Sequence, residues 1–303
     1  MPQPVLVECV PNFSEGRRPA VVDAICTALA SVAGVKLLDR TSDASHNRSV
    51  VTLAGNGDDL VEAILRGARV AREQIDLREH TGEHPRMGAT DVVPFVPISG
   101  VTMERCVELA RACGRRLGEE LQIPVFLYEQ AATRPERRNL ATVRKGQFEK
   151  LRELIGSDPA RDPDFGPRAI HPTAGATAVG ARKFLIAWNV NLETTDLELA
   201  RGIAQAIREK DGGFPAVKAM GFFLDDLQCA QVSMNLVDFE TTAILTVFEE
   251  IERRARAAGV EVRETELIGL APAAALPGDV PARIRLRDWK PERCIVERVA
   301  GVA

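Results

Sequence analysis

The order of strand-like and helix-like segments limits the folds open to this chain of 303 residues more than any other feature of its sequence. Short apolar runs, typical of buried strands, alternate with stretches whose apolar residues recur at helical spacing. In the first part of the chain the order is strand-helix-strand-strand-helix-strand, over residues 5–10, 19–33, 35–39, 49–54, 58–75 and 91–98. This order is typical of the ferredoxin-like, or split βαβ, unit.

The second part of the chain repeats this order, over residues 184–189, 194–210, 217–224, 230–236, 239–258 and 260–270. A further helix at 102–121 and a strand at 124–128 follow the first unit. We therefore predict an α/β (α+β plait) protein of two ferredoxin-like βαββαβ subdomains, residues 1–180 and 181–303, with helices covering the sheets. The halves share no obvious residue-level similarity, so the predicted duplication is one of architecture.

Prolines and glycines mark the places where this pattern is less regular. Pro94 and Pro97 predict that the strand at 91–98 is an edge strand or carries a bulge. Residues 156–180, rich in Pro, Asp and Gly, are predicted to form a long ordered or functional connection between the subdomains. The region after 272 is punctuated by proline and is predicted to end in a strand at 294–299.

The composition argues against several classes of protein. The 39 basic and 43 acidic side chains give a net charge of −4, which removes the global electrostatic case for nucleic-acid binding. No stretch approaches the roughly 18 apolar residues of a membrane helix, and the start of the chain lacks the features of a secretory signal. The six cysteines form no Cys-x-x-Cys pair, as is typical of reduced core residues. We expect a cytoplasmic protein that acts at neither nucleic acid nor membrane.

Common signatures of nucleotide and hydrolase chemistry are absent from the sequence. Residues 55–60 lack the third glycine of a dinucleotide-binding fingerprint. Residues 175–180 have Walker-like glycine spacing but continue into Ala-Arg-Lys where Lys-Ser/Thr is needed. No Gly-x-Ser-x-Gly nucleophile elbow occurs. Both chemistries are therefore disfavoured.

One loop, residues 81–88 (Thr-Gly-Glu-His-Pro-Arg-Met-Gly), carries the best candidate for catalysis. Pro85 disfavours helical geometry at His84, and the flanking glycines allow the backbone to approach a ligand. Glu83 and Arg86 would move the imidazole pKa in opposite directions if they pack against it. A histidine whose pKa stays near neutral can both accept and donate a proton. His84 is either this acid/base or a solvated loop histidine.

A metal site is the other chemistry open to these histidines. His80 and His84 would converge on one ion only if they lay on a helix, with Glu83 nearby. Gly82 and Pro85 make a helix poor at this position. We therefore predict no metal.

Two further loops have the composition of binding segments. In residues 39–48, Arg48 could hold a carboxylate bidentately while Asp39, Asp43 and Asn47 hold an amine or amide. The alternative for this loop is a solvated connection between strands. The turn at 10–16 follows the first strand, where ligands commonly lie, although a plain turn has the same composition.

Residues 164–175 mix prolines and glycines with Phe165, Arg168 and His171. A flexible linker would need neither rigid prolines nor the apolar Phe165 and Ile170. A loop of this kind could cover a flat heteroaromatic ligand while Arg168 meets its acidic tail. The alternative interpretation is an interdomain linker.

Taken together, these segments resemble the formiminotransferase family, the transferase unit of formimidoyltransferase-cyclodeaminase. The resemblance covers about residues 5–276, and its motifs are long enough to be specific. The stretches that carry it are 7–16 (Val-Glu-Cys-Val-Pro-Asn-Phe-Ser-Glu-Gly), 82–89 (Gly-Glu-His-Pro-Arg-Met-Gly-Ala), 164–167 (Asp-Phe-Gly-Pro), 175–185 and 236–240.

The resemblance implies transfer of a formimino group from N-formimino-L-glutamate to N5 of tetrahydrofolate, a step of histidine degradation and one-carbon metabolism. It implies that His84 is the catalytic acid/base, that two α/β subdomains of the plait type are present, and that no cyclodeaminase unit is. The implied folate-binding residues are Gly166, Pro167, Arg168, Ala169, Ile170, His171, Pro172, Thr173, Ala174 and Gly175. The chain departs from the family at Thr41, where an aspartate is common.

From this chemistry we expect tetrahydrofolate as co-substrate, no metal, and Asp39, Asn47, Arg48 and Arg86 at the donor. The alternatives are a formyl donor, including action on 5-formyltetrahydrofolate, and a non-catalytic sensor of folate or an amino acid. A homodimer is expected because edge strands of plait units often pair with a second copy. Any cyclodeaminase would be a separate protein.

Overall fold

The computed structural model describes residues 5–83 and 85–301 and is a mixed α/β structure with two sheets. The chain divides into two compact units, Met1–Arg182 and Lys183–Ala303, which are described one at a time. None of the helices in the described parts of the chain combines the length and the apolar character needed to cross a bilayer. Its six cysteines are free thiols, as predicted, and five of them are buried.

The first unit is built on a sheet of seven strands. They are β1 (Leu6–Cys9), β2 (Asn12–Phe13), β3 (Lys36–Asp43), β4 (Arg48–Gly55), β5 (Thr90–Ser99), β6 (Val125–Glu129) and β7 (Thr177–Ala181). The short β1 and β2 lie end to end, and both pair antiparallel with β4 on one side and with β5 on the other. β3 pairs with the far side of β4, whereas β7 lies parallel to both β5 and β6.

The structure refines three predictions about these strands. The run at 5–10 is one part of an interrupted strand, because Pro11 separates β1 from β2 and cannot donate to a ladder. β5 is a central strand and not an edge strand, but the alternative prediction of a bulge is confirmed by a register shift opposite Leu6 and Val7, next to Pro97. The predicted connection at 156–180 ends in β7, whose small residues fit a fully buried position between β5 and β6.

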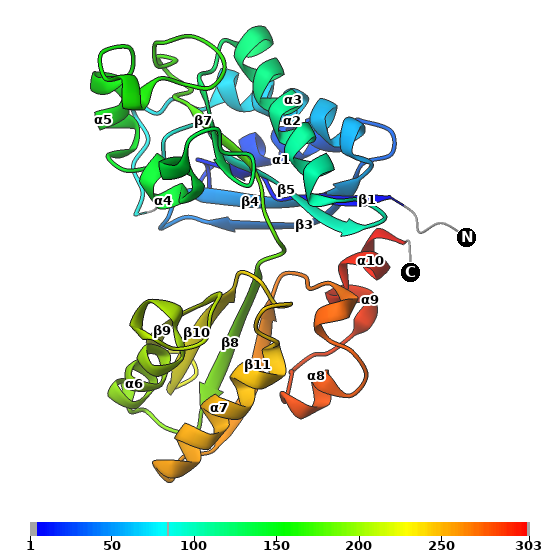
Figure 1. Cartoon of the computed structure of the whole chain (residues 1–303), viewed down its shortest axis with the longest axis vertical. Helices are drawn as coiled ribbons and strands as arrows, with labels where there is room; N and C mark the ends of the chain where they lie inside the picture. The colour runs from blue at the N-terminus through cyan, green and yellow to red at the C-terminus, as the bar shows by residue number, and fades with distance from the viewer. Residues whose placement is uncertain (1–4, 84, 302–303) are drawn as a thin grey trace. The chain divides into compact units, whose positions relative to one another are not determined.

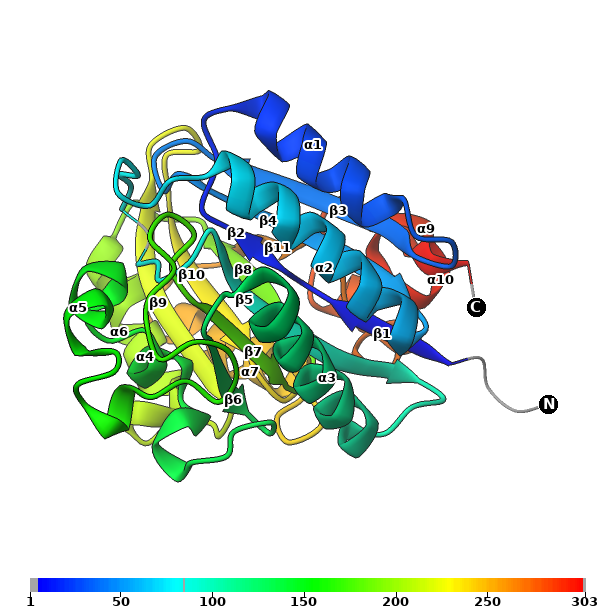
Figure 2. The same ribbon diagram turned by 90° about the horizontal axis from the view of Figure 1, so that it is seen from above.

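Helices α1 (Pro19–Ala30), α2 (Gly57–Gln74) and α3 (Met103–Leu121) lie side by side on one face of this sheet (Figure 2). Asn56 caps α2: its side chain accepts a hydrogen bond from the backbone N–H of Asp59. Thr102 caps α3 in the same way. The segment between β6 and β7 contains α4 (Leu140–Val143), α5 (Gln147–Leu154) and the 3₁₀ turns η1 (Pro135–Arg138) and η2 (Pro159–Arg161).

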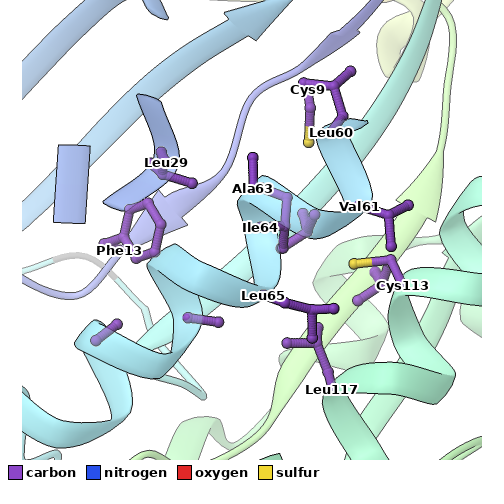
Figure 3. Close-up of a cluster of buried hydrophobic side chains, with 14 of the residues drawn as sticks. Cys9, Phe13, Leu29, Leu60, Val61, Ala63, Ile64, Leu65, Cys113 and Leu117 are labelled. Carbon is purple, nitrogen blue, oxygen red and sulfur yellow. The ribbon is translucent and has the colours of Figure 1, made fainter. Parts of the chain in front are cut away.

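The main core of the first unit lies between the three helices and the sheet (Figure 3). Phe13 and Cys9 enter it from the strands, Ile64 from α2 and Leu117 from α3, and each is almost fully buried. A smaller cluster occupies the opposite face of the sheet, where Phe126 and Tyr128 contact residues of α4 and α5. Successive residues of one strand point to opposite faces of the sheet, so membership of one cluster or the other shows which face a side chain lies on.

The second unit contains β8 (Ile186–Leu192), α6 (Leu197–Ile207), η3 (Glu209–Asp211), β9 (Val217–Leu224), β10 (Cys229–Leu236), α7 (Ile244–Ala257) and β11 (Val262–Ile268). Its four strands are antiparallel in the order β11-β8-β10-β9 (Figure 1). The predicted order of strands and helices is confirmed. α7 begins five residues later than predicted, because the Asp238 side chain holds the N–H groups of Glu240 and Thr241 in a turn.

The region after β11 contains the 3₁₀ turn η4 (Ala273–Ala275) and three short helices, α8 (Val280–Arg283), α9 (Pro291–Cys294) and α10 (Val296–Ala300). The predicted strand at 294–299 is therefore wrong. Val296 and Ala300, four residues apart, are both buried on one side of α10. The apolar residues at 295–300 fit one helical turn as well as a strand, and their packing in the fold stabilises the helix.

Candidate active site

The face of the first sheet opposite α1–α3 carries most of the residues predicted to bind the donor. In β4, Val51 and Leu53 point into the main core, so Arg48 and Thr52 point to the other face. Asp39 pairs with Thr52 and Asp43 pairs with Arg48, which places both aspartates on that face. Asp39 is nonetheless four residues along the ladder from Arg48, a separation of about 13 Å.

Arg48 lies at the first position of β4 and is mostly buried. It donates a hydrogen bond from Nη2 to Oδ1 of Asn12, the first residue of β2. Burial lowers the pKa of Arg48, and the positive charge of Arg144 lowers it further. Its Nε is buried without a partner among the described residues.

Asn47 is a structural centre for the loops around it. Its Oδ1 accepts a hydrogen bond from the N–H of Gly16 (2.9 Å), and its Nδ2 donates to the carbonyl of Thr81 (3.0 Å). A Cβ atom on Gly82 would lie 2.4 Å from the carbonyl oxygen of His46, so only glycine fits there. The 43–48 loop and the 81–88 loop are thus locked together.

The 81–88 loop also packs against the end of the predicted folate segment. Gly88 and Gly175 form an isolated antiparallel bridge, and the N–H of Ala176 donates to the carbonyl of Met87 (2.9 Å). Gly175 has φ +70°, and a Cβ atom there would lie 2.2 Å from the carbonyl oxygen of Met87. Ser14 donates from Oγ to the carbonyl of Gly88 (2.7 Å). Three loops distant in sequence therefore meet at residues 87–88.

His84, the predicted catalytic residue, lies outside the described residues. Its chain neighbours Glu83 and Pro85 are both exposed. The loop is fixed on either side, since the N–H of Glu83 donates to the carbonyl of Ser45 (3.3 Å) and Oδ1 of Asp91 accepts from the N–H groups of Met87 (2.7 Å) and Gly88 (3.2 Å).

Arg86 is buried and engaged by a carboxylate of the protein itself. It forms a bidentate pair with Glu149, with distances of 2.9 Å from Nη1 and 2.7 Å from Nη2. This pair lowers the pKa of Glu149. Arg86 Nε also donates to Nδ1 of His80 (3.2 Å). Arg86 thereby joins the 81–88 loop to α5.

His80 is half-buried and held in one tautomer. Because Nδ1 accepts from Arg86, Nε2 carries the proton and donates to the carbonyl of Asn47 (2.9 Å). Burial lowers the pKa of His80, and the charge of Arg86 acts in the same direction. An open cavity of about 570 Å³ lies between residues 80–82 and the start of α5 at 147–149. It is lined by several basic groups and adjoins the loop that carries His84.

The predicted folate segment, residues 166–175, is an ordered loop. Its first eight residues are at least partly exposed, while Ala174 and Gly175 are buried. Gly166 (φ +84°) packs on the end of α3, where a Cβ atom would lie 2.7 Å from the carbonyl oxygen of Ile123. Arg168 is exposed and paired with Asp162 (2.8 Å). His171 closes a tight turn with Gly175.

Two residues that the sequence analysis did not single out organise this region. Asp91 is 2% exposed and binds the backbone of Met87 and Gly88 through one oxygen and Arg144 through the other. The signal for Asp91 was its place at the start of a strand, just after the 81–88 motif. Nothing in the sequence singles out Arg144. In the described parts of the chain, no three His, Cys, Asp or Glu side chains gather closely enough to hold a metal ion.

The fold and the site together define an α/β protein with a polar site built by converging loops, as in enzymes that position small polar substrates. The family described as "Formiminotransferase domain, N-terminal subdomain" matches residues 6–182, and "Formiminotransferase domain" matches residues 187–278. The chain belongs to the formiminotransferase family, as the sequence predicted, and is a transferase.

Its relatives include glutamate formimidoyltransferases that match over nearly their whole length. The chain is 51% identical to the one from Streptococcus pyogenes serotype M1, covering 96% of this chain and 97% of that protein. It is 50% identical to the one from Thermoplasma acidophilum, covering 89% of each. It is 49% identical to the formimidoyltransferase-cyclodeaminase of Sus scrofa, covering 89% of this chain but 51% of that protein.

Proposed function

We propose that this chain is a glutamate formimidoyltransferase, which transfers the formimino group of N-formimino-L-glutamate to N5 of tetrahydrofolate and releases L-glutamate. The near full-length identity to proteins of that name supports the proposal. Tetrahydrofolate is a co-substrate, and the chemistry requires no metal. The reaction belongs to histidine degradation and one-carbon metabolism.

The observation that carries the proposal is the packing of residues 87–88 against residues 174–176. It joins the loop that contains His84 to the loop for which we propose folate binding, residues 166–175. A transferase for two substrates needs its acid/base beside the acceptor, and the contact between these two loops supports that arrangement.

In the proposed mechanism, N5 of tetrahydrofolate attacks the amidine carbon of the donor and a new C–N bond forms. His84 accepts the proton that N5 loses. It then donates a proton to the glutamate nitrogen as the old C–N bond breaks. General acid–base catalysis of this kind contributes about 10²–10⁴ in rate. We propose that Arg48, Asn47 and Asp39 lie near the donor, whereas Arg86 shapes the loop through Glu149.

The finer architecture is also a proposal. The strand order β11-β8-β10-β9, with one helix after β8 and one after β10, fits a ferredoxin-like plait. We propose such βαββαβ subdomains for residues 1–180 and 181–303. We further propose a cytoplasmic homodimer, and a cyclodeaminase on a separate chain, whereas the mammalian relatives are named as both activities.

The test is a spectroscopic transfer assay with tetrahydrofolate and N-formimino-L-glutamate, run on the wild type and on His84→Ala. The variant should lose about 10²–10⁴ of kcat while tetrahydrofolate binding, measured by equilibrium dialysis, stays intact. Near-normal turnover by the variant removes His84 from the mechanism. A wild type that binds both ligands but forms no product is a sensor, and one that turns over only N-formyl-L-glutamate or 5-formyltetrahydrofolate is a formyl-group enzyme.

A further inference from the structure

Buried polar atoms without a partner concentrate at one place in the first unit. Four such side-chain atoms occur among the described residues: Trp188 Nε1 of the second unit, and Arg48 Nε, Thr90 Oγ1 and Arg144 Nε of the first. Buried polar groups are nearly always hydrogen-bonded in native proteins, because each one left without a partner costs free energy. The two arginine nitrogens belong to side chains close enough for their charges to act on each other, which indicates a missing ligand.

Arg48 and Arg144 lie around Asp91 and Asn12, and the charges of Arg144 and Asp91 both act on Arg48. Thr90 pairs with Phe13, which points into the main core, so its side chain lies on the other face of the sheet from Arg48. Asn12 accepts a hydrogen bond from Arg48, and Asp91 forms an ion pair with Arg144. β4, β2 and β5 are neighbours in the sheet. α4, which ends at Val143 just before Arg144, packs over the face of the sheet to which Arg48 points.

The charges in this cluster do not balance. Arg48 has the neutral side chain of Asn12 as its hydrogen-bond partner, and Arg144 shares Asp91 with two backbone N–H groups. The two guanidinium groups thus share the Asp91 carboxylate, because the other carboxylate whose charge acts on Arg48, Asp43, is paired with His46 (2.9 Å). Partly buried positive charge is stabilised when an anion completes the hydrogen bonds, and the fork of arginine suits a carboxylate.

The other candidate arginines lack this property. Arg86 is bidentate to Glu149, and Arg168 is exposed and paired with Asp162. Neither has an unsatisfied buried donor in the parts of the chain described. The free donors therefore belong to Arg48 and to Arg144.

We propose that Arg48 and Arg144 bind a carboxylate of the glutamyl group of a substrate, a deepening that rests on the proposed function. Both substrates of that function carry glutamyl carboxylates, so the donor and the glutamyl tail of the folate are the two sources. Asp91 positions Arg144 and also binds the backbone of residues 87–88. Asp91 therefore connects the proposed carboxylate subsite to the loop that contains His84.

The experiment measures kcat and both KM values for the wild type, Arg144→Met, Arg144→Lys and a control, Arg105→Met. Arg105 is an exposed arginine of α3 whose partners are Asp58 and Glu108. Arg144→Met should raise one KM by about 10- to 100-fold, the effect of losing a charge-assisted hydrogen bond. Arg144→Lys keeps a cation beside Asp91 but loses the two-pronged guanidinium. Its KM should therefore lie between the KM values of the wild type and Arg144→Met. The control should match the wild type.

Truncated substrates identify the carboxylate. N-formimino-4-aminobutyrate lacks the α-carboxylate of the donor, N-formimino-L-glutamine lacks the γ-carboxylate, and tetrahydropteroate lacks the glutamyl tail of the folate. The increase in KM caused by Arg144→Met should disappear with the compound that lacks the bound carboxylate. Removing the arginine and removing the carboxylate then abolish the same interaction, so their effects do not add. A purely structural arginine would give the same penalty with all of them.

Direct binding of glutarate, measured by titration calorimetry, separates this proposal from the proposed function. If the wild type forms no product but binds glutarate, and Arg144→Met weakens that binding, the carboxylate subsite is supported and the proposed function is refuted. A wild type that transfers the group, with both KM values unchanged in Arg144→Met and Arg144→Lys, retains the function and overturns the subsite. If Arg144→Met fails to fold, Arg144→Lys alone decides between these outcomes.

Discussion

Asp91→Asn is the substitution that tests most directly how this site is held together. The Asp91 carboxylate is almost fully buried and bonds to the N–H groups of Met87 and Gly88 and to Arg144. An asparagine has the same shape, and its carbonyl oxygen can still accept from both backbone groups. Its amide, however, presents N–H donors to the guanidinium of Arg144, so the ion pair is lost while the loop contacts remain.

The expected loss of stability follows from the burial of that pair. Asp91 and Arg144 are 3% and 14% exposed at their side chains, and breaking a buried pair by removing one charge costs about 3–5 kcal/mol. For a unit of this size, 1 kcal/mol shifts Tm by about 2–4 °C, which gives a drop of roughly 6–20 °C. The exposed pair of Asp58 with Arg105 (2.9 Å) should contribute about 1 kcal/mol or less.

The assay compares Asp91→Asn with Asp58→Asn by differential scanning calorimetry. Hydrogen exchange of the peptide covering 85–91 then distinguishes loss of the ion pair from loss of the loop contacts. Asp91→Ala also removes the oxygen that accepts from residues 87 and 88, so it should speed exchange in this peptide. Asp91→Asn keeps that oxygen and should speed exchange much less. The reasoning is refuted if Asp91→Asn costs no more stability than Asp58→Asn.

Two further predictions concern the same loops. Gly175→Ala should destabilise the protein by about 1–3 kcal/mol or more, because φ is +70° and the new Cβ would meet the carbonyl of Met87. Gly202→Ala, inside α6 with nothing within 4 Å of an added Cβ, should instead stabilise it by about 1 kcal/mol; equal Tm values for the two variants would contradict this. Burial and Arg86 lower the pKa of His80, so below about pH 6.5 the unfolded state binds the proton first and stability falls. His80→Gln should flatten the Tm profile between pH 6.5 and 5, and parallel profiles would argue against the shift.

The sequence predicted the site's loops better than the roles of individual side chains within them. The 81–88 and 164–175 segments were identifiable because proline, glycine and histidine in short succession suit neither a strand nor a helix. Arg86 illustrates the limit: its type and place suggested a substrate clamp, yet it forms an ion pair with Glu149, 63 residues away. A charged side chain binds whichever opposite charge the fold brings to it, and the sequence does not show that partner.

Element types were predictable wherever the apolar pattern was long, as in α2 and α3 and in the six elements from β8 to β11. Short segments were not. The run at 294–299 fits a strand or one helical turn, and β7 is made of small residues without a β-forming pattern. In such segments local preference is weaker than the packing that surrounds them, so tertiary contacts decide the outcome.

The amino-acid sequence alone determined the family, the order of strands and helices in the second unit, and the presence of a histidine in a Gly- and Pro-bounded loop, because each depends on residues close together in the chain. Only the tertiary structure revealed that Asp91 supports that loop and that Arg48 and Arg144 have unpaired donors. Those properties depend on strands β4, β2 and β5 lying side by side and on α4 packing over them. Hydrogen bonding and desolvation act over a few ångströms in space, whatever the separation along the chain.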